Sequence, residues 1–151
     1  MTTLAWDGAT LAADRRMDTG NGFTACSKIH KCGRFWYGDA GGAADAEMCK
    51  EWLSGGAKPD ERPELSAPGQ HGLAVEARTG HLFIVEGARP TLVRVMDPQF
   101  AVGSGGDFAR AAMAFGKTAV EAVEFAAKFD SNTGNGTEHV VIRKRPGAKR
   151  K

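Results

Sequence analysis

The sequence predicts an α+β fold in which two β-sheets pack face to face with helices on their outer sides. Its segments follow in the order strands, helix, strands, two helices and strand, without the alternation of a parallel α/β fold. The chain has 151 residues, the size of one domain and enough to bury a full core. Hydrophobic residues make up 42% and charged residues 25% of the chain, the balance of a soluble globular protein.

Short strand-like segments open the chain. Asp7-Gly8 is a turn pair that predicts a hairpin, and Gly20-Asn21-Gly22 interrupts the block. The expected strands occupy residues 3–6, 10–13, 23–30 and 34–40.

A helix is predicted next, at residues 43–53. Its apolar side chains recur at a spacing of four residues, as in the pair Met48 and Trp52, and Gly55-Gly56 follows as a stop signal. Residues 54–69 are rich in glycine, proline and charge, which predicts an exposed loop.

A second β block and two helices complete the predicted fold. Thr79-Gly80 marks a hairpin, and Thr118 with Glu121 forms a capping box at the start of the last helix. The helices are expected at residues 107–115 and 118–129, and the strands at residues 72–77, 81–86, 91–96, 100–103 and 138–142.

The composition excludes several classes of protein. No apolar run approaches the roughly 18 residues of a membrane span, and charged residues from Asp7 onward leave no apolar signal core. Three cysteines without a C-x-x-C pair favour free thiols in a reducing, cytoplasmic setting. Because Cys26, His30 and Cys32 match no standard zinc spacing, no metal or other cofactor is predicted.

Charge is unevenly distributed along the chain. Residues 143–151 hold six of the twenty basic residues and no acid, which leaves fourteen basic against eighteen acidic residues elsewhere, a net −4. Such tails contact nucleic acid or acidic partners in some proteins. The favoured interpretation here is a disordered, solubilising end.

Thr2 is the first candidate for chemistry. Because threonine is small, Met1 is a suitable substrate for removal, after which Thr2 presents an α-amine and a hydroxyl together. An α-amine titrates at about 7.7–8.0, and a threonine hydroxyl needs a base within hydrogen-bond reach to act as a nucleophile.

Asp14 and Lys28 are the next candidates. Strand alternation would place Lys28 on one face with Cys26 and His30. A buried ammonium group needs a partner, and Asp14 could supply it. The alternative is a surface lysine and a turn aspartate.

Two polar loops remain. The turn at residues 103–107 precedes a helix but lacks the spacing of phosphate-binding loops, so nucleotide binding is not predicted. Residues 130–136 are interpreted as a polar loop after a helix.

Taken in order, these segments resemble the proteasome β-subunit family, and especially its bacterial HslV-type peptidases. The resemblance runs from Thr2 to about Ile142, and its most specific string is Ala101-Val102-Gly103-Ser104-Gly105-Gly106-Asp107-Phe108-Ala109. The other strings that carry it are Thr2–Ala5, Leu11–Arg15, Ser27–Ile29, Ala40–Ala46, Thr118–Val123 and Asp130–Gly134.

The resemblance implies an N-terminal nucleophile (Ntn) hydrolase with a four-layer αββα sandwich, formed by one domain at residues 1–142. Thr2 matches the nucleophile once Met1 has gone. Asp14 would fix Lys28 as a cation, which lowers the pKa of the Thr2 amine and hydroxyl.

Further residues match the family's active site. Gly41 matches the residue whose backbone N–H stabilises the tetrahedral oxyanion. The outer polar shell that hydrogen-bonds the Thr2 amine matches Ser104, Asp130 and Thr133, with Thr133 where the family usually has serine.

The substrate pocket is also implied by position in the family. The residues expected to line the pocket for the side chain before the cut are Met17, Cys26, His30, Asp39 and Glu47. Asp39 and Glu47 would make this pocket acidic and favour a basic residue. The alternative is that either acid faces solvent or pairs with a neighbouring subunit.

Members of the family assemble into rings that enclose their active sites. The resemblance therefore implies a cytoplasmic homo-oligomeric ring or double ring that cleaves peptides or unfolded proteins, with an unfolding ATPase as a possible partner and with no membrane or nucleic acid. Two alternatives stay open: an inactive, scaffolding relative that retains Met1, and a nucleic-acid-associated protein that uses its basic tail.

Overall fold

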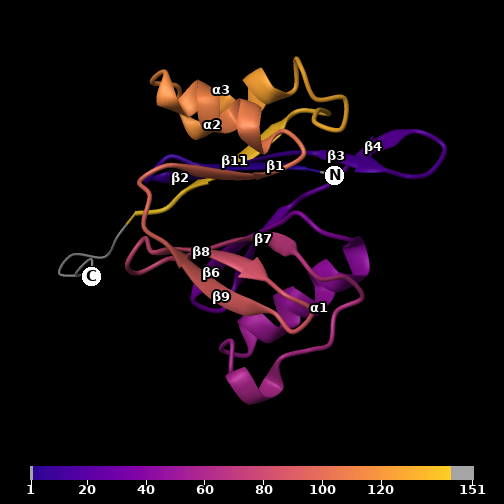
Figure 1. Ribbon diagram of the computed structural model, residues 1–151, viewed down its shortest axis with the longest axis vertical. Helices are drawn as coiled ribbons and strands as arrows, with labels where there is room; N and C mark the ends of the chain where they lie inside the picture. The colour runs from indigo at the N-terminus through magenta and orange to yellow at the C-terminus, as the bar shows by residue number, and fades with distance from the viewer. Residues whose placement is uncertain (1, 144–151) are drawn as a thin grey trace.

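The computed structural model describes residues 2–143. Met1 and most of the predicted basic tail, residues 144–151, lie outside the described residues. Within the described part, two antiparallel sheets lie one above the other, and helices lie on their outer sides (Figure 1).

The first sheet carries the start of the chain. Its strands pair antiparallel in the order β10-β1-β2-β11. The bounds of these strands are Thr3–Trp6 for β1, Thr10–Asp14 for β2, Phe100–Gly103 for β10 and Thr137–Val141 for β11. Because β1 is a central strand, the residue before it is held close to the ends of β2 and β10.

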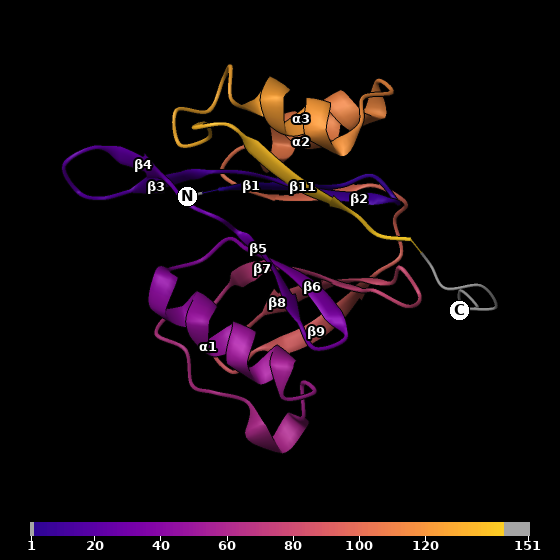
Figure 2. The same cartoon turned by 180° about the vertical axis from the view of Figure 1, so that it is seen from behind.

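The second sheet is a five-stranded meander in the order β5-β6-β7-β8-β9. Its bounds are Ile29–Cys32 for β5, Phe35–Asp39 for β6, Gln70–Glu76 for β7, Leu82–Glu86 for β8 and Thr91–Val95 for β9. A separate hairpin of β3, Arg16–Asp18, and β4, Phe23–Ala25, projects beside the start of the chain (Figure 2).

Helices cover the outer sides of both sheets (Figure 1). Their bounds are Ala43–Ser54 for α1, Gly106–Ala114 for α2 and Ala119–Ala126 for α3, with a 3-10 turn at Pro59–Glu61. The capping box predicted for Thr118 and Glu121 is present, and both of its reciprocal hydrogen bonds form.

Three apolar clusters hold these layers together. Small residues such as Ala5, Ala12 and Ala122 let α2 and α3 pack closely on the first sheet. Larger side chains such as Leu4 and Leu73 fill the space between the two sheets. A third cluster, with α1 residues such as Leu53, joins α1 to the outer face of the second sheet.

The mixture of helices and sheets predicted from the sequence is confirmed, but one predicted strand is wrong. Residues 23–30 form two strands of different sheets, β4 and β5, joined by an extended link. The link leaves the first hairpin where the Cys26 N–H donates to the Arg15 carbonyl, and it enters the second sheet where Glu138 accepts from the Lys28 and Ile29 N–H groups. The alternation argument therefore does not hold for Lys28, which lies in the link.

Three smaller differences concern single segments. The predicted loop at residues 54–69 contains the 3-10 turn and buries Leu65 against the third cluster. The short strand β3 was not predicted. Helix α3 ends at Ala126, three residues before Phe129, whose side chain is exposed.

Candidate functional site

Thr2, Asp14 and Lys28 converge although they come from different segments. Thr2 directly precedes β1, and Asp14 is the last residue of the neighbouring antiparallel strand β2. Lys28 comes from the link before β5 and reaches from the second sheet toward the first. The fold thus closes the site at one end of the space between the two sheets.

The contacts among these three side chains are direct. Lys28 Nζ donates to Thr2 Oγ1 at 2.5 Å and to Asp14 Oδ1 at 2.8 Å. The Lys28 and Asp14 side chains are 4% and 1% exposed, and Thr2 is buried as well. Because a buried ammonium without a counter-ion is costly, the ion pair with Asp14 offsets the burial of Lys28 beside the threonine hydroxyl.

Asp14 is itself fixed by the backbone. Its Oδ1 accepts the N–H of Thr3 at 3.0 Å, and its Oδ2 accepts those of Arg16 at 3.2 Å and Gly134 at 3.1 Å. Hydrogen bonds from N–H groups stabilise the ionised carboxylate. The charge that holds Lys28 therefore has a fixed position and direction.

A second polar network lies on the other side of Thr2. Asp130 Oδ2 accepts from Ser104 Oγ and from Thr133 Oγ1, both at 2.6 Å. Ser104 Oγ also lies 3.5 Å from the Thr2 carbonyl oxygen, and Thr133 Oγ1 lies 2.7 Å from Thr3 Oγ1. The three predicted shell residues are thus brought together around Thr2 and Thr3.

The pKa of Asp130 reflects this network. Partial burial raises it, but the hydrogen bonds from Ser104, Thr133 and the Asn132 N–H outweigh burial and lower the pKa from its ordinary value. Asp130 is therefore a stable acceptor for the two hydroxyl groups at neutral pH.

Gly103 brings the end of β10 against Thr2. It has φ +98°, and any Cβ on it would collide with the Thr2 carbonyl oxygen. Only glycine adopts this conformation freely and permits such a close approach. Gly103 therefore serves the packing of the chain start, and Gly105 does the same beside Thr3 Oγ1.

Gly41 lies beside the same site. Thr2 lines a cavity of about 280 Å³ together with Ala40, Gln70, Gly103 and Ser104. Gly41 follows Ala40 directly and precedes the first turn of α1, whose N-cap, Gly42, makes no side-chain cap hydrogen bond. A backbone N–H at this position is suited to stabilise negative charge.

The residues expected to form the substrate pocket are only partly gathered. His30 Nε2 and Asp39 Oδ2 lie 3.5 Å apart, and burial raises the pKa of Asp39 against the attraction of His30 and Lys28. His30 and Glu47 share a cavity of about 440 Å³ that Thr2 does not line.

The other members of the expected pocket are more dispersed. The Glu47 side chain is 74% exposed and pairs with Lys50, as the solvent-facing alternative anticipates. Met17 lies exposed on β3, and Cys26 is half-buried in the link, where burial raises the pKa of its thiol against the attraction of Lys28. The structure thus groups His30 with Asp39 and places Met17 on the projecting hairpin.

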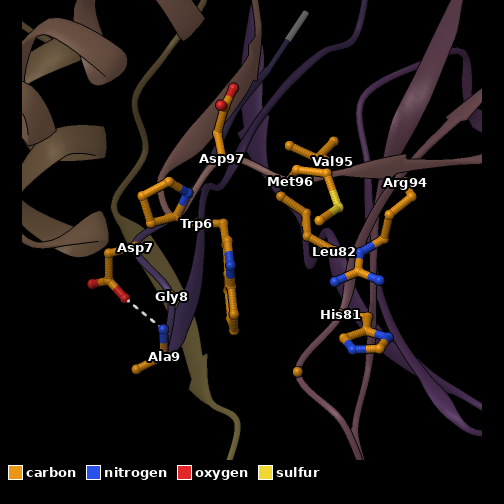
Figure 3. A pocket seen from close by; sticks show the side chains of 12 residues that line it. Trp6, Asp7, Gly8, Ala9, His81, Leu82, Arg94, Val95, Met96 and Asp97 are labelled. Carbon is orange, nitrogen blue, oxygen red and sulfur yellow. Dashed lines mark hydrogen bonds between the residues drawn. The ribbon is translucent and has the colours of Figure 1, made fainter. Parts of the chain in front are cut away.

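The largest of the described cavities lies at the other end of β1 (Figure 3). It measures about 490 Å³ and is lined by Trp6, His81, Arg94 and Met96 among others. Because Thr2 precedes β1 and Trp6 ends it, the length of that strand separates this cavity from the candidate site.

Residues 2–143 contain neither a candidate metal centre nor a helix that could span a membrane. No three side chains of the types that ligate metals gather there into a candidate metal centre. Within the same range, none of the helices combines the length and apolar character needed to cross a membrane.

Two residues of the site were missed by the sequence analysis. Gln70 lines the Thr2 cavity, and Thr3 joins the outer network through its hydroxyl. A signal for Thr3 was present in the sequence. Thr3 directly follows Thr2, and strand alternation turns the Thr3 side chain to the face opposite that of Thr2. Nothing in the local sequence distinguishes Gln70, which follows a loop rich in proline and glycine.

The fold is that of HslV-type peptidase structures, which confirms the resemblance seen in the sequence at the level of fold. The chain is similar to Thiobacillus denitrificans BPH in complex with Epoxomicin, with a TM-score of 0.65 and 19% identity over 96% of this chain and 99% of that one. It is also similar to eukaryotic HslV from Trypanosoma brucei, with a TM-score of 0.63 and 19% identity over 93% and 97%. No protein-family model and no curated sequence matches the chain significantly.

Proposed function

We propose that this protein is a threonine peptidase that uses Thr2 as its nucleophile after removal of Met1. In this proposal residues 1–142 form one Ntn-hydrolase domain, and its layers are the four-layer αββα sandwich of that class. The observation that carries the proposal is the 2.5 Å contact between Thr2 Oγ1 and a buried Lys28 that is held by Asp14.

The reaction is acyl transfer to the threonine hydroxyl. The free amine of Thr2 accepts the hydroxyl proton while Oγ1 attacks the peptide carbonyl carbon, and the carbonyl oxygen becomes an oxyanion. Collapse of this intermediate expels the amine half of the substrate, which takes up a proton, and leaves an ester on Thr2. Water then attacks the ester and releases the acid half.

Each neighbouring group has a role in this scheme. The Lys28 ammonium stabilises negative charge on Oγ1 as its proton leaves, and Asp14 keeps that ammonium in place. The Gly41 N–H stabilises the oxyanion. Asp130 and the two hydroxyl groups that donate to it, those of Ser104 and Thr133, orient the backbone of the first residues and the freed amine.

Substrate preference and assembly extend the proposal. Asp39 beside His30 favours a basic residue before the cut. The substrates are peptides or unfolded proteins, and the active sites face the chamber of a cytoplasmic homo-oligomeric ring or double ring, with an unfolding ATPase as partner. Three free cysteines accord with a reducing compartment.

The test starts from a chain whose first residue is Thr2, produced by cleavage of an N-terminal fusion and verified by intact mass. This material is expected to cleave small fluorogenic peptides and to bind Epoxomicin, whereas Thr2→Ala is expected to do neither. The matched control is Thr24→Ala, on the exposed strand β4, which should keep full activity.

The same measurements discriminate the scaffolding alternative. If trimmed protein is inert toward a broad peptide set and Thr2→Ala changes nothing, the peptidase proposal is wrong. A chain that retains Met1 when purified from its own cells would favour the inactive relative.

A further inference from the structure

An irregularity at the start of β7 places a buried histidine beside the candidate oxyanion glycine. The ladder between β7 and β8 shifts its register between Gln70 and Gly72, which leaves His71 as the extra residue of a bulge. Gly72 has φ +144°, and any Cβ on it would collide with the Gly38 carbonyl. Bulges of this kind re-aim side chains and are frequent next to active sites.

His71 holds the turn between β6 and α1 through its backbone and its ring. Its carbonyl oxygen accepts the Ala40 N–H at 3.0 Å and the Tyr37 hydroxyl at 2.7 Å. Its ring packs against Gly41 so closely that a Cβ on that glycine would stand 3.2 Å from His71 Nδ1. His71 is only 2% exposed, so the ring itself belongs to the interior.

The far side of the ring is anchored as well. His71 Nε2 lies 3.1 Å from the Gly87 carbonyl oxygen. Because a carbonyl only accepts, Nε2 carries the hydrogen of this contact, and Nδ1 lies on the side of the ring that faces Gly41. The imidazole thus spans from the loop after β8 to the turn before α1.

The turn supported by His71 faces the nucleophile. Ala40, which precedes Gly41, and Gln70, which precedes His71, both line the cavity that contains Thr2. Gly41 and Gly42 are adjacent and exposed, and because glycine has no side chain, neither residue fixes the direction of its own backbone. A catalytic N–H donor is effective only if it is held in place before the oxyanion forms.

We propose that His71 is a positioning residue for this site: its ring holds the Gly41 N–H in the direction that stabilises the oxyanion. This inference rests on the proposed peptidase function. The effect of the His71 ring is expected in the transition state, because the ring holds the Gly41 N–H, which stabilises negative charge that develops only during the reaction. Removal of the ring should therefore lower kcat and leave KM nearly unchanged.

The test compares His71→Ala, His71→Gln and the parent chain, all beginning at Thr2, with one fluorogenic peptide. His71→Ala is expected to lower kcat by roughly tenfold to a hundredfold, with KM within about twofold, because loosening one oxyanion donor forfeits part of its effect. His71→Gln, whose amide can still donate to the Gly87 carbonyl, should recover most of the activity. The matched control is His139→Ala, whose side chain is exposed on β11.

A pair of inhibitors separates positioning from general damage. A peptide aldehyde forms a hemiacetal with Thr2 Oγ1, which places its oxygen where the oxyanion would stand, whereas the matching peptide alcohol binds without this bond. His71→Ala should weaken the aldehyde in proportion to kcat and leave the alcohol unchanged. Equal weakening of both compounds, or no change in kcat, overturns the inference.

Two further readouts keep the outcomes distinct. If His71→Ala does not fold, Tyr37→Phe takes its place, because it removes the hydroxyl that donates to the His71 carbonyl. Roughly a threefold fall in kcat is expected for Tyr37→Phe. An unchanged kcat in that variant overturns the inference. A parent chain that shows no Thr2-dependent cleavage refutes the peptidase function itself, and the proposed role of His71 falls with it.

Discussion

Thr2 Oγ1 and Lys28 Nζ lie 2.5 Å apart inside the protein, although 26 positions separate these residues in the sequence. The lysine reaches across from the link before the second sheet, and the threonine stands at the entry to the first. The junction of the two sheets is therefore also the place where Thr2, the proposed nucleophile, meets the side chain of Lys28. Any change that loosens this junction should affect stability and activity together.

Replacement of the lysine tests this coupling. Lys28→Met keeps most of the side-chain volume but leaves the Asp14 carboxylate buried without its counter-ion, which should lower the free energy of unfolding by about 3 kcal/mol. kcat/KM should fall by at least roughly a hundredfold, because the charge beside Oγ1 is lost. Urea denaturation and peptide cleavage measure the two effects.

The control for this change is Lys128→Met, on an exposed position after α3. Its stability and activity should match those of the parent chain. An active Lys28→Met protein would contradict the role assigned to the ammonium group.

The meeting of Thr2, Asp14 and Lys28 could be predicted from the sequence, but its support could not. The resemblance named these three residues because each lies in a short string of family-like sequence. The Gly134 N–H that binds Asp14 comes from a loop 120 positions away, and no local pattern indicates such a contact. Backbone donors carry no sequence signal of their own, so they are visible only in the folded chain.

The pH dependence of stability should report on Asp130. Hydrogen bonds from Ser104 and Thr133 lower its pKa below the ordinary 3.8. A carboxyl whose pKa is lowered on folding adds stability that is fully present above the ordinary value and is lost as pH falls through the lowered one. Thermal unfolding between about pH 5 and pH 2 should therefore show a smaller loss in Asp130→Asn than in the parent chain. Parallel curves would contradict this assignment.

Substrate preference should depend on Asp39 more than on Glu47. Asp39 is largely buried and faces His30, whereas the Glu47 side chain is 74% exposed and neutralised by Lys50. Asp39→Asn should lower the preference for arginine over leucine before the cut by roughly tenfold, and Glu47→Gln by less than about twofold. The ratio of kcat/KM for two matched peptides measures this preference.

The same preference should depend on pH. Burial raises the pKa of Asp39, so its negative charge is lost at a higher pH than in an ordinary aspartate. The preference for arginine should weaken as pH falls through that raised value and should be independent of pH in Asp39→Asn. A stronger preference at lower pH would show that another group sets it.

Sequence reasoning failed where the chain leaves regular structure. Residues 23–30 have the composition of one strand. In the fold they belong to two strands of different sheets, and the link between these strands brings Lys28 to Asp14. The bulge at His71 could likewise not be seen in the sequence. The extra residue shifts the alternation of side chains along β7 but leaves the segment with the composition of a strand. Both irregularities lie next to Thr2, where position matters more than local propensity.

A pair of glycine substitutions separates the effect of backbone strain from the effect of a steric clash with Thr2. Gly103 and Gly116 have similar positive φ angles, +98° and +91°, but a Cβ on Gly103 would collide with the Thr2 carbonyl oxygen, whereas one on Gly116 would meet nothing within 4 Å. Gly116→Ala should therefore cost only the strain of its backbone, about 1 kcal/mol, and keep full activity. Gly103→Ala should cost several times more, on the order of 3 kcal/mol, and should abolish cleavage by displacing Thr2 from Lys28. If the two variants lose equal stability and Gly103→Ala stays active, the close approach of β10 to the chain start has no part in positioning the nucleophile.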